Sequence, residues 1–371
     1  MKFTLDKNAL LKKLQLLSKG IPSRSTLPII SSALFTVKDE ILSMRATDLE
    51  ISINLKYKIE GGEDGCVAIP LGKLLEITSA MPEKNIDFSV SDIGKMNISC
   101  NSGRYTIMGQ PSEEFPSEQV VENSKRLQVS SGELKDIINN TSYAASKDDL
   151  KPVLQGVLFQ IQNDGIVSVA TDGHRLVKLE KKKLHSIDYI GNIVVPIKFL
   201  ALLATQLTGD GDVSMLIGDN HIQVQLEDVT ITTRIIKDPY PDYEGVIPKN
   251  NTKTLIINKN HFTEAIKRVS IFSNKSSRQV ALELSESSMT ITTEDPENIT
   301  TGKEILDCDY DGEPMTIGYN AFYLKEVLQH QQSEEIKIML NSPLNAGLFL
   351  PIDQNDNDNK TTLLMPIRLN D

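Results

Sequence analysis

The chain repeats itself three times with a period of about 125 residues, and this repetition limits its fold more than any other feature. The dipeptides Phe115-Pro116, Tyr240-Pro241 and Met365-Pro366 follow one another at that interval. The tripeptide Ala46-Thr47-Asp48 returns as Ala170-Thr171-Asp172. The period is longer than a solenoid repeat and matches the commonest size of a domain. We therefore predict three domains, at residues 1–123, 124–249 and 250–371.

Two helical patterns recur in each third of the chain. They are recognised by apolar residues at three- and four-residue spacing. The first follows a residue that can cap a helix, and the second begins near a proline or tyrosine. The starting points are Asp6, Ser131 and Asn258 for the first helix, and Pro70, Pro196 and Tyr319 for the second.

A pair of alternating, strand-like segments follows the first helix of each third. The pairs are Ala33–Val37 with Ile41–Arg45, Val157–Ile161 with Ile166–Ala170, and Ala281–Leu284 with Met289–Thr293. Further alternating strands follow the second helix. This order predicts an α+β protein of antiparallel sheets with helices on one face. Short linkers are expected at residues 121–126 and 248–254.

The net charge of −11 disfavours a polyanionic partner by its total, but the charge is unevenly distributed. The six helical windows carry a net +7, so the rest of the chain carries −18. If the helices share one surface, that surface is basic and could hold a polyanion while the remainder repels it. The alternative is that these lysines are simply solvated. Charge alone does not decide between the two.

Several classes of protein are disfavoured by what the sequence lacks. No apolar run is long enough to cross a membrane and no cleavable signal follows the start, so we expect a cytoplasmic protein without a membrane partner. The three cysteines are widely spaced and the five histidines do not cluster, which predicts reduced thiols, no metal and no cofactor.

A catalytic interpretation rests on His174 beside Asp172 and Arg175, an arrangement that could act as a base with an orienting carboxylate. No nucleophile motif such as GxSxG accompanies it, and neither GxxxxGK[ST] nor GxGxxG occurs. We therefore predict that the protein is not an enzyme and has no catalytic residues.

Five motifs spread along the whole chain resemble the bacterial sliding clamp family, the beta subunit of DNA polymerase III. They are Arg24–Ile29 (RSTLPI), Ala46–Glu50 (ATDLE), Ala170–Leu176 (ATDGHRL), Tyr240–Tyr243 (YPDY) and Met365–Leu369 (MPIRL). The resemblance implies three repeated clamp-type domains, with antiparallel sheets outside and helices lining a ring. It implies a homodimer that encircles double-stranded DNA without sequence specificity. Such a processivity factor tethers the DNA polymerase III catalytic subunit, the clamp loader and other replication and repair proteins.

The resemblance also assigns residues to three surfaces. At the dimer contact, the first domain of one chain meets the third domain of the other. That contact would use Arg104, Tyr105, Ile107, Ile271, Phe272, Glu297 and Glu304. DNA would be faced by Arg24, Lys73, Lys147, Lys151 and Lys198. A groove for short peptides of partner proteins would be formed by Leu154, Thr171, Gly173, His174, Arg175, Leu176, Pro241, Val246, Tyr323, Met365, Pro366, Ile367 and Arg368.

The chain departs from the family pattern beside the groove. Pro152 and Val153 stand where aromatic residues can occur, and Gly245 replaces a basic residue, so the preferred peptide is not predicted. A second interpretation, favoured by the acidic total charge, is a scaffold that binds proteins but never DNA. It shares the fold and the groove, and the sequence leaves it open.

Overall fold

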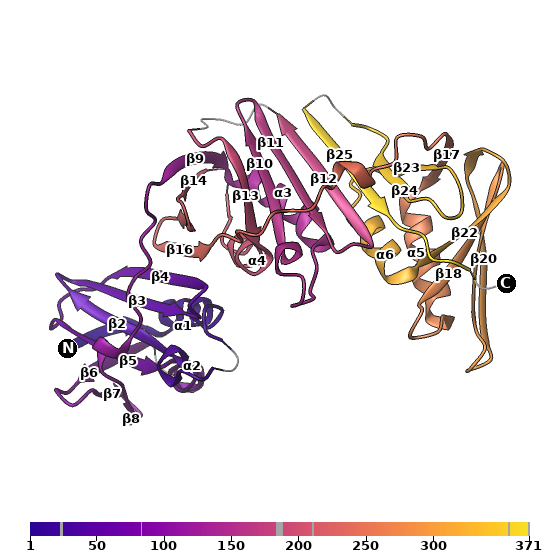
Figure 1. The fold of residues 1–371 in the computed structure, drawn as a ribbon. Coiled ribbons are helices and arrows are strands. Elements are labelled where there is room, and N and C mark those ends of the chain that lie inside the picture. Colours follow the sequence, from indigo (N-terminus) through magenta and orange to yellow (C-terminus); the bar gives the residue numbers. More distant parts are fainter. Residues whose placement is uncertain (23–24, 83, 183–187, 210, 355–356, 370–371) are drawn as a thin grey trace. The chain divides into compact units, whose positions relative to one another are not determined.

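The chain folds into two compact units, residues 1–131 with 208–235, and residues 132–207 with 236–371 (Figure 1). The computed structural model describes residues 1–22, 25–82, 84–182, 188–209, 211–354 and 357–369. The middle third of the chain contributes to both units. Each unit is a set of antiparallel sheets with helices packed on them, as the sequence predicts.

Within the described residues, the first unit has two helices that contact each other and two sheets. The helices are α1 (Lys7–Ser18) and α2 (Leu71–Ala80). One sheet has the order β1 (Lys2–Asp6), β6 (Asn85–Val90), β7 (Lys95–Cys100), β8 (Gly103–Met108). The other runs β5 (Gly65–Pro70), β2 (Ser32–Lys38), β3 (Ile41–Thr47), β4 (Ile51–Lys58), β16 (Val229–Arg234), β15 (His221–Gln225), β14 (Asp212–Ile217), β9 (Lys125–Ser130). Short 3-10 helices occupy Pro28–Ser31 and Ser112–Glu114.

The second unit has the same ingredients. Its helices are α3 (Ser131–Thr141), α4 (Ile197–Ala204), α5 (Lys259–Val269) and α6 (Ala321–Gln329). The larger sheet has the order β13 (Gly191–Pro196), β10 (Gly156–Gln162), β11 (Gly165–Thr171), β12 (Arg175–Lys182), β25 (Asp358–Leu364), β24 (Gly347–Pro351), β23 (Glu335–Leu340), β17 (Lys253–Asn258), β21 (Asp309–Asp311). The smaller has β20 (Thr300–Asp307), β19 (Ser288–Asp295), β18 (Gln279–Ser285), β22 (Met315–Asn320). Short 3-10 helices lie at Ser142–Ala144, Pro152–Gln155, Glu244–Val246 and Ser270–Phe272.

Each of the two larger sheets forms where the edge strand of one four-stranded set pairs with the edge strand of another, a pairing that we call a joint. The four strands β9-β14-β15-β16 are joined through β16 to β4, and the four strands β17-β23-β24-β25 are joined through β25 to β12. Both joints are antiparallel. Each third of the chain has its strands in the same order. The last strand of the first third, β8, is therefore the counterpart of β16 and β25, and β20 in the last third is the counterpart of β4 and β12. Within the described residues β8 and β20 are sheet edges, so the third joint of the repeat is open.

Local sequence determines where the helices begin. The Oδ1 atom of Asp6 accepts a hydrogen bond from Ala9 N at 3.0 Å, and Oδ1 of Asn258 accepts one from His261 N at 3.0 Å. These contacts satisfy backbone donors at the two helix starts. Both capped starts and all three predicted strand pairs are confirmed.

Two predictions about the repeat are wrong in detail. The linkers at 121–126 and 248–254 are shorter than expected, because Arg126 and Thr254 already pair within strands β9 and β17. The third landmark dipeptide is not the counterpart of the other two. Equivalent bridges join Ala68 to Gln110, Val194 to Ile236 and Gly318 to Ile367. Gln110 and Ile236 precede the dipeptides at Phe115 and Tyr240, whereas Ile367 follows the dipeptide at Met365. The equal spacing of the three dipeptides is therefore coincidental.

The repeated Ala-Thr-Asp tripeptide forms the same turn in both places. In the first, the hydroxyl of Thr47 donates to Ile51 O at 2.8 Å and accepts from Leu49 N at 3.0 Å. The carboxylate of Asp48 accepts from the amides of Glu50 at 3.0 Å and Ile51 at 2.7 Å. Short polar side chains compete in this way for backbone groups that a turn leaves unpaired.

We expect Asp48→Ala to speed hydrogen exchange at the amides of Glu50 and Ile51 by roughly fivefold, because about 1 kcal/mol is lost with each acceptor. Amide exchange followed by NMR or mass spectrometry measures this. Asp92→Ala, which removes an exposed carboxylate between β6 and β7, is the control. Equal effects of the two variants would contradict the role of the turn.

Candidate functional site

The second Ala-Thr-Asp turn connects β11 to β12 and presents two side chains in opposite directions. Thr171 and Asp172 repeat the hydrogen bonds of the first turn, and Gly173 has a φ of 91°, a conformation that glycine adopts without strain. His174 is exposed and the next residue, Arg175, is buried. The turn thus places an exposed imidazole and a buried guanidinium on consecutive residues.

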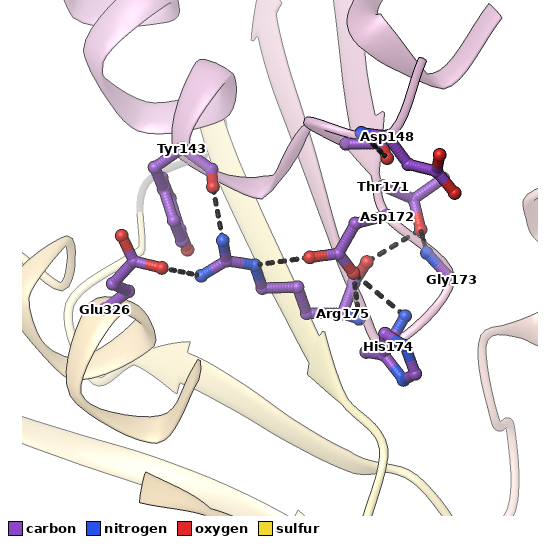
Figure 2. A network of polar contacts seen from close by, with 9 residues as sticks. Tyr143, Asp148, Thr171, Asp172, Gly173, His174, Arg175 and Glu326 are labelled. Carbon is purple, nitrogen blue, oxygen red and sulfur yellow. Dashed lines mark hydrogen bonds and ion pairs between the residues drawn. The ribbon is translucent and has the colours of Figure 1, made fainter. Parts of the chain in front are cut away.

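Arg175 is the centre of a buried polar network (Figure 2). Its Nε donates to Asp172 Oδ2 at 3.1 Å, Nη1 to Glu326 Oε2 at 2.6 Å, and Nη2 to Tyr143 O at 2.6 Å. The side chain is only 4% exposed, so its charge requires these two carboxylates. The network connects the 3-10 helix Ser142–Ala144 that follows α3, the turn before β12, and α6.

Two aromatic rings complete the environment of Arg175. Its guanidinium lies 5.2 Å from the ring centre of Tyr143 and 4.9 Å from that of Tyr323. Tyr323 also stacks on His174, with 5.5 Å between ring centres and an interplanar angle of 19°. Burial of Arg175 against Tyr323 therefore fixes the position of the exposed imidazole.

A cleft of about 310 Å³ opens beside this network. Its wall includes His174, Phe322 and Tyr323, and its rim carries Lys147 and Lys151. The remaining lining residues are Ala145, Ser146, Asp148, Asp172 and Arg175. An aromatic wall with charged groups at its rim is suited to a ligand that has both apolar and polar parts.

An apolar cluster lies next to the turn, beneath the segment that contains Pro241 and Val246. Its buried members are Leu158, Val169, Leu176, Val194, Tyr243, Ala346, Leu348 and Leu363, and Val153, Tyr240, Ile247 and Met339 pack against it. The hydroxyl of Tyr243 donates to Gln160 Oε1 at 2.5 Å. Burial raises the pKa of Tyr243 to about 12 and that of Tyr240 further, so both phenols stay protonated donors.

The structure brings most of the predicted groove residues together. Met365 N donates to His174 O at 2.8 Å, which holds the C-terminal segment against the turn, and Ser146 N donates to Leu154 O at 2.8 Å. Ile367 N donates to Gly318 O at 2.9 Å. Val246 and Met365 expose 57% and 42% of their surface, so both are free to receive an apolar partner. Within the described residues, no hydrogen bond or ring contact links Pro366 or Arg368 to the cleft.

The models of one protein family match almost the whole chain. The N-terminal, central and C-terminal domains of the DNA polymerase III beta subunit match residues 1–119, 128–242 and 244–368. The chain belongs to this family. Its three matched regions are clamp domains, so the predicted threefold organisation is confirmed.

Curated relatives of the family agree. The beta sliding clamps of Pseudomonas aeruginosa and Escherichia coli K12 are 31% and 30% identical to this chain over 100% of both sequences. The crystal structure of the DNA polymerase III beta subunit of Pseudomonas aeruginosa has a TM-score of 0.91 at 30% identity, covering 99% of this chain and 100% of that one. A sliding clamp from Bartonella birtlesii bound to griselimycin has a TM-score of 0.94 at 27% identity, covering 100% of both chains.

Membership of the beta clamp family bears on one further prediction. The family is one of non-catalytic subunits, so the chain is not an enzyme. No helix in the described part of the chain is long and apolar enough to span a membrane. The three cysteines are free.

Sequence reasoning missed several residues of the site. Glu326 lies three residues after Tyr323 on α6 and therefore on the same helix face, which is a signal that could have found it. Phe322 and Tyr143 have no such signal, because only the tertiary fold brings Phe322 to the cleft and Tyr143 to Arg175. Ala346 and Leu363 belong to the apolar cluster and look like ordinary core residues in the sequence.

The predicted DNA-facing residues fall into three groups. Lys73 and Lys198 are exposed in the first turns of α2 and α4. Lys147 and Lys151 line the cleft beside His174 and do not lie on a helix. Arg24 lies outside the described residues. Their contact with DNA stays a prediction.

The predicted dimer residues lie on or beside the two open sheet edges. Tyr105 and Ile107 are two residues apart and lie on the same side of β8, where Tyr105 is 39% exposed and Ile107 is 7% exposed. The place of Ile107 in a dimer contact stays a prediction. Met108, at the end of β8, is 60% exposed and was not among the predicted residues.

The predicted contact residues near β20 include two exposed apolar side chains. Ile271 and Phe272 expose 76% and 42%. Glu297 is exposed, but Glu304 is already held by Arg268 of its own chain, with Nε–Oε1 and Nη2–Oε2 distances of 2.8 and 2.7 Å. The pairing lowers the pKa of Glu304 through the hydrogen bond with Arg268. A partner would have to share this carboxylate.

We expect Arg175→Ala to lower the free energy of unfolding of the second unit by about 3 kcal/mol, because it leaves the carboxylates of Asp172 and Glu326 without their cation. Chemical denaturation followed by circular dichroism measures the change. Arg368→Ala, at an exposed position, is the control and should stay within about 0.5 kcal/mol of the parent. A loss no larger than the control's would contradict the structural role of Arg175.

Proposed function

We propose that this protein is a DNA polymerase processivity factor that closes as a homodimeric ring around double-stranded DNA. It slides without sequence specificity and tethers the DNA polymerase III catalytic subunit, the clamp loader and other replication and repair proteins. The observation that carries the proposal is the open third joint, with edges at β8 and β20. A replication clamp acts on the chromosome, so we expect it in the bacterial cytoplasm.

The repeat specifies how a second copy would bind. Joining β20 of one copy to β8 of another gives the order β1-β6-β7-β8-β20-β19-β18-β22, which has the same four-plus-four pattern as the sheet made by β9, β14–β16 and β2–β5. Two copies have two such joints, and both pairs of edges are then covered. Each chain contributes three domains, for which we keep the bounds 1–123, 124–249 and 250–371.

Apolar side chains beside these edges support the joint. Exposed apolar side chains lie on β8, at Tyr105 and Met108, and near β20, at Ile271 and Phe272. They would be buried between the two copies. Ion pairs at the rim, such as Arg104 with Glu297, would add about 0 to 1 kcal/mol each. Apolar burial and backbone pairing therefore supply most of the binding energy.

Contact with DNA would involve its phosphates only. The helices carry the excess of positive charge, and Lys73 and Lys198 are exposed on them. A few cationic contacts produce weak binding that depends strongly on salt. Weak contacts suit a ring, because closure around the DNA provides retention and tight phosphate binding would slow movement.

The groove would bind a short peptide with an apolar anchor. The exposed side chains of Val246 and Met365 and the stacked pair His174–Tyr323 would form its surface, and the buried network of Arg175 would hold that surface in place. Griselimycin, found on the Bartonella clamp, is a probe for the same surface here.

Retention on DNA should depend on the topology of the DNA. After loading by a clamp loader on nicked circular DNA, we expect the protein to remain through gel filtration at moderate salt. Cutting the circle should release at least ten times more protein, because a ring slides off an end. Release measured by fluorescence from a labelled chain gives the ratio.

The control is the same circle cut with a bulky protein bound at both ends, which should block release. Equal loss from closed and cut circles would overturn the ring. That outcome would favour the alternative of a scaffold that binds proteins but never DNA.

Changing the groove should separate partner binding from assembly. We expect Met365→Lys to weaken griselimycin and polymerase binding at least tenfold, about 1.4 kcal/mol or more, because a charge replaces an apolar contact. Isothermal titration measures the affinity, and native mass spectrometry checks that the dimer persists. Lys198→Ala is the matched control and should leave both unchanged. Unaltered affinity, or loss of the dimer together with binding, would contradict the site.

A further inference from the structure

The second unit contains a second cavity, of about 290 Å³, that is separate from the cleft beside His174. Two lysines line it, Lys181 on β12 and Lys360 on β25. Three aspartates, Asp136, Asp353 and Asp358, line it as well. The proposed clamp function makes no use of this cavity.

Lys360 occupies a position where lysine is rare. It points to the buried side of β25, as does Thr362 two residues later, and is 6% exposed. A buried ammonium normally requires a carboxylate partner. Within the described residues, none of the ion pairs includes Lys360.

The hydrogen-bond partners of Lys360 are both uncharged. Its Nζ donates to Asn140 Oδ1 at 2.7 Å and to the backbone oxygen of His330. The amide of Asn140 is oriented by its own Nδ2, which donates to the backbone oxygen and Oδ1 of Asp136 at 2.9 and 2.7 Å. The carbonyl oxygen of Asn140 is thereby turned to the lysine, and the carboxylate of Asp136 is turned elsewhere.

Lys181 has the opposite environment in the same cavity. Its Nζ lies 2.7 Å from Asp136 Oδ2 and 3.2 Å from Asp358 Oδ1. These carboxylates raise the pKa of Lys181 despite its burial. Burial lowers the pKa of Lys360 to about 8, against a smaller opposing effect of Asp136. The other groups facing Lys360 are Asp353 and Asp358 on the cavity wall and the imidazole of His330, whose pKa is lowered by burial.

We propose that Lys360 is a nucleophilic amine that accepts an acyl group from a small activated acyl donor entering this cavity. The two sources of such a group are acyl phosphates and acyl thioesters. The structure distinguishes Lys360 from Lys181, because only Lys360 has neutral partners that let its amine lose a proton near neutral pH. The proposal does not depend on the clamp function.

The reaction balances without any further reactant. The lone pair of the neutral Nζ forms a bond to the acyl carbon, and the bond from that carbon to the phosphate oxygen or thiol sulfur breaks. Phosphate or thiolate leaves with the bonding electron pair, and the nitrogen releases a proton to solvent. The product is an amide, and nothing is oxidised or reduced.

Acylation would change the junction at which Lys360 lies. The amide nitrogen keeps one hydrogen, so it can donate to Asn140 or to His330 O but not to both. One buried acceptor would lose its partner where α3, the end of α6 and β25 meet. The modification would therefore loosen contacts between segments on either side of the joint of β12 with β25.

Competitive labelling of the full-length protein with trace acetic anhydride tests the reactivity of each lysine. Mass spectrometry measures the rate at Lys360 and Lys181 between pH 6.5 and 10.5. We expect the rate at Lys360 to rise with a midpoint near 8 and to exceed that at Lys181 at least fivefold at pH 7.5. No labelling of Lys360, or a midpoint near that of an ordinary lysine, would overturn the proposal.

A matched pair of variants tests the cause. Asn140→Asp places a carboxylate beside Nζ and should reduce labelling of Lys360 at pH 7.5 roughly tenfold, whereas Asn163→Asp, at an exposed turn, should leave it unchanged. Equal effects would contradict the role of the neutral partner. If Asn140→Asp does not fold, the pH profile of the parent still decides.

Separate incubations with acetyl phosphate and acetyl coenzyme A distinguish the two sources. Acetylation of Lys360 ahead of Lys181 by either donor supports the proposal and identifies the source. Failure of both donors to modify Lys360 overturns it, even if the anhydride reacts. Lys360→Arg confirms the assignment of the modified peptide.

Discussion

Backbone pairing between the edge strands of neighbouring domains is the interaction on which this structure depends. It is made at β4 with β16 and again at β12 with β25. Each joint removes two rows of unpaired amides and carbonyls from the surface. The same repeat leaves β8 and β20 without partners in a single chain. In the proposed dimer a second copy would supply both partners by the same strand pairing that joins the domains within one chain.

The joint of β12 with β25 also creates the proposed partner-binding surface. It brings the turn at His174 next to the segment that begins with Met365, and Met365 N then bonds to His174 O. Arg175 reinforces the junction, because its guanidinium binds Asp172 on one side and Glu326 on the other. Stability and the proposed recognition thus depend on the same residue, although Arg175 itself is almost fully buried. Lys360 occupies another part of this junction, where its neutral partners make it chemically distinct.

The sequence predicts features that depend on neighbours along the chain. Asp6 and Asn258 are capping residues beside apolar periods, so both helix starts were predictable. The tertiary partners of Arg175 were not, since Tyr143 and Glu326 are 32 and 151 residues away. The low exposure of Ile107, on the same side of β8 as the exposed Tyr105, was not predictable either, because it depends on tertiary packing. The third landmark failed because equal spacing in a sequence does not ensure an equal place in a sheet.

Hydrogen exchange at β8 and β20 in solution tests the central claim most directly. The dimer predicts that backbone amides of both strands are protected at micromolar concentration, to a degree similar to those of β4 and β16, and lose protection together on dilution. Exchange as fast as in unpaired edge strands at every concentration would contradict the account, since the third joint would then remain open and no ring could close.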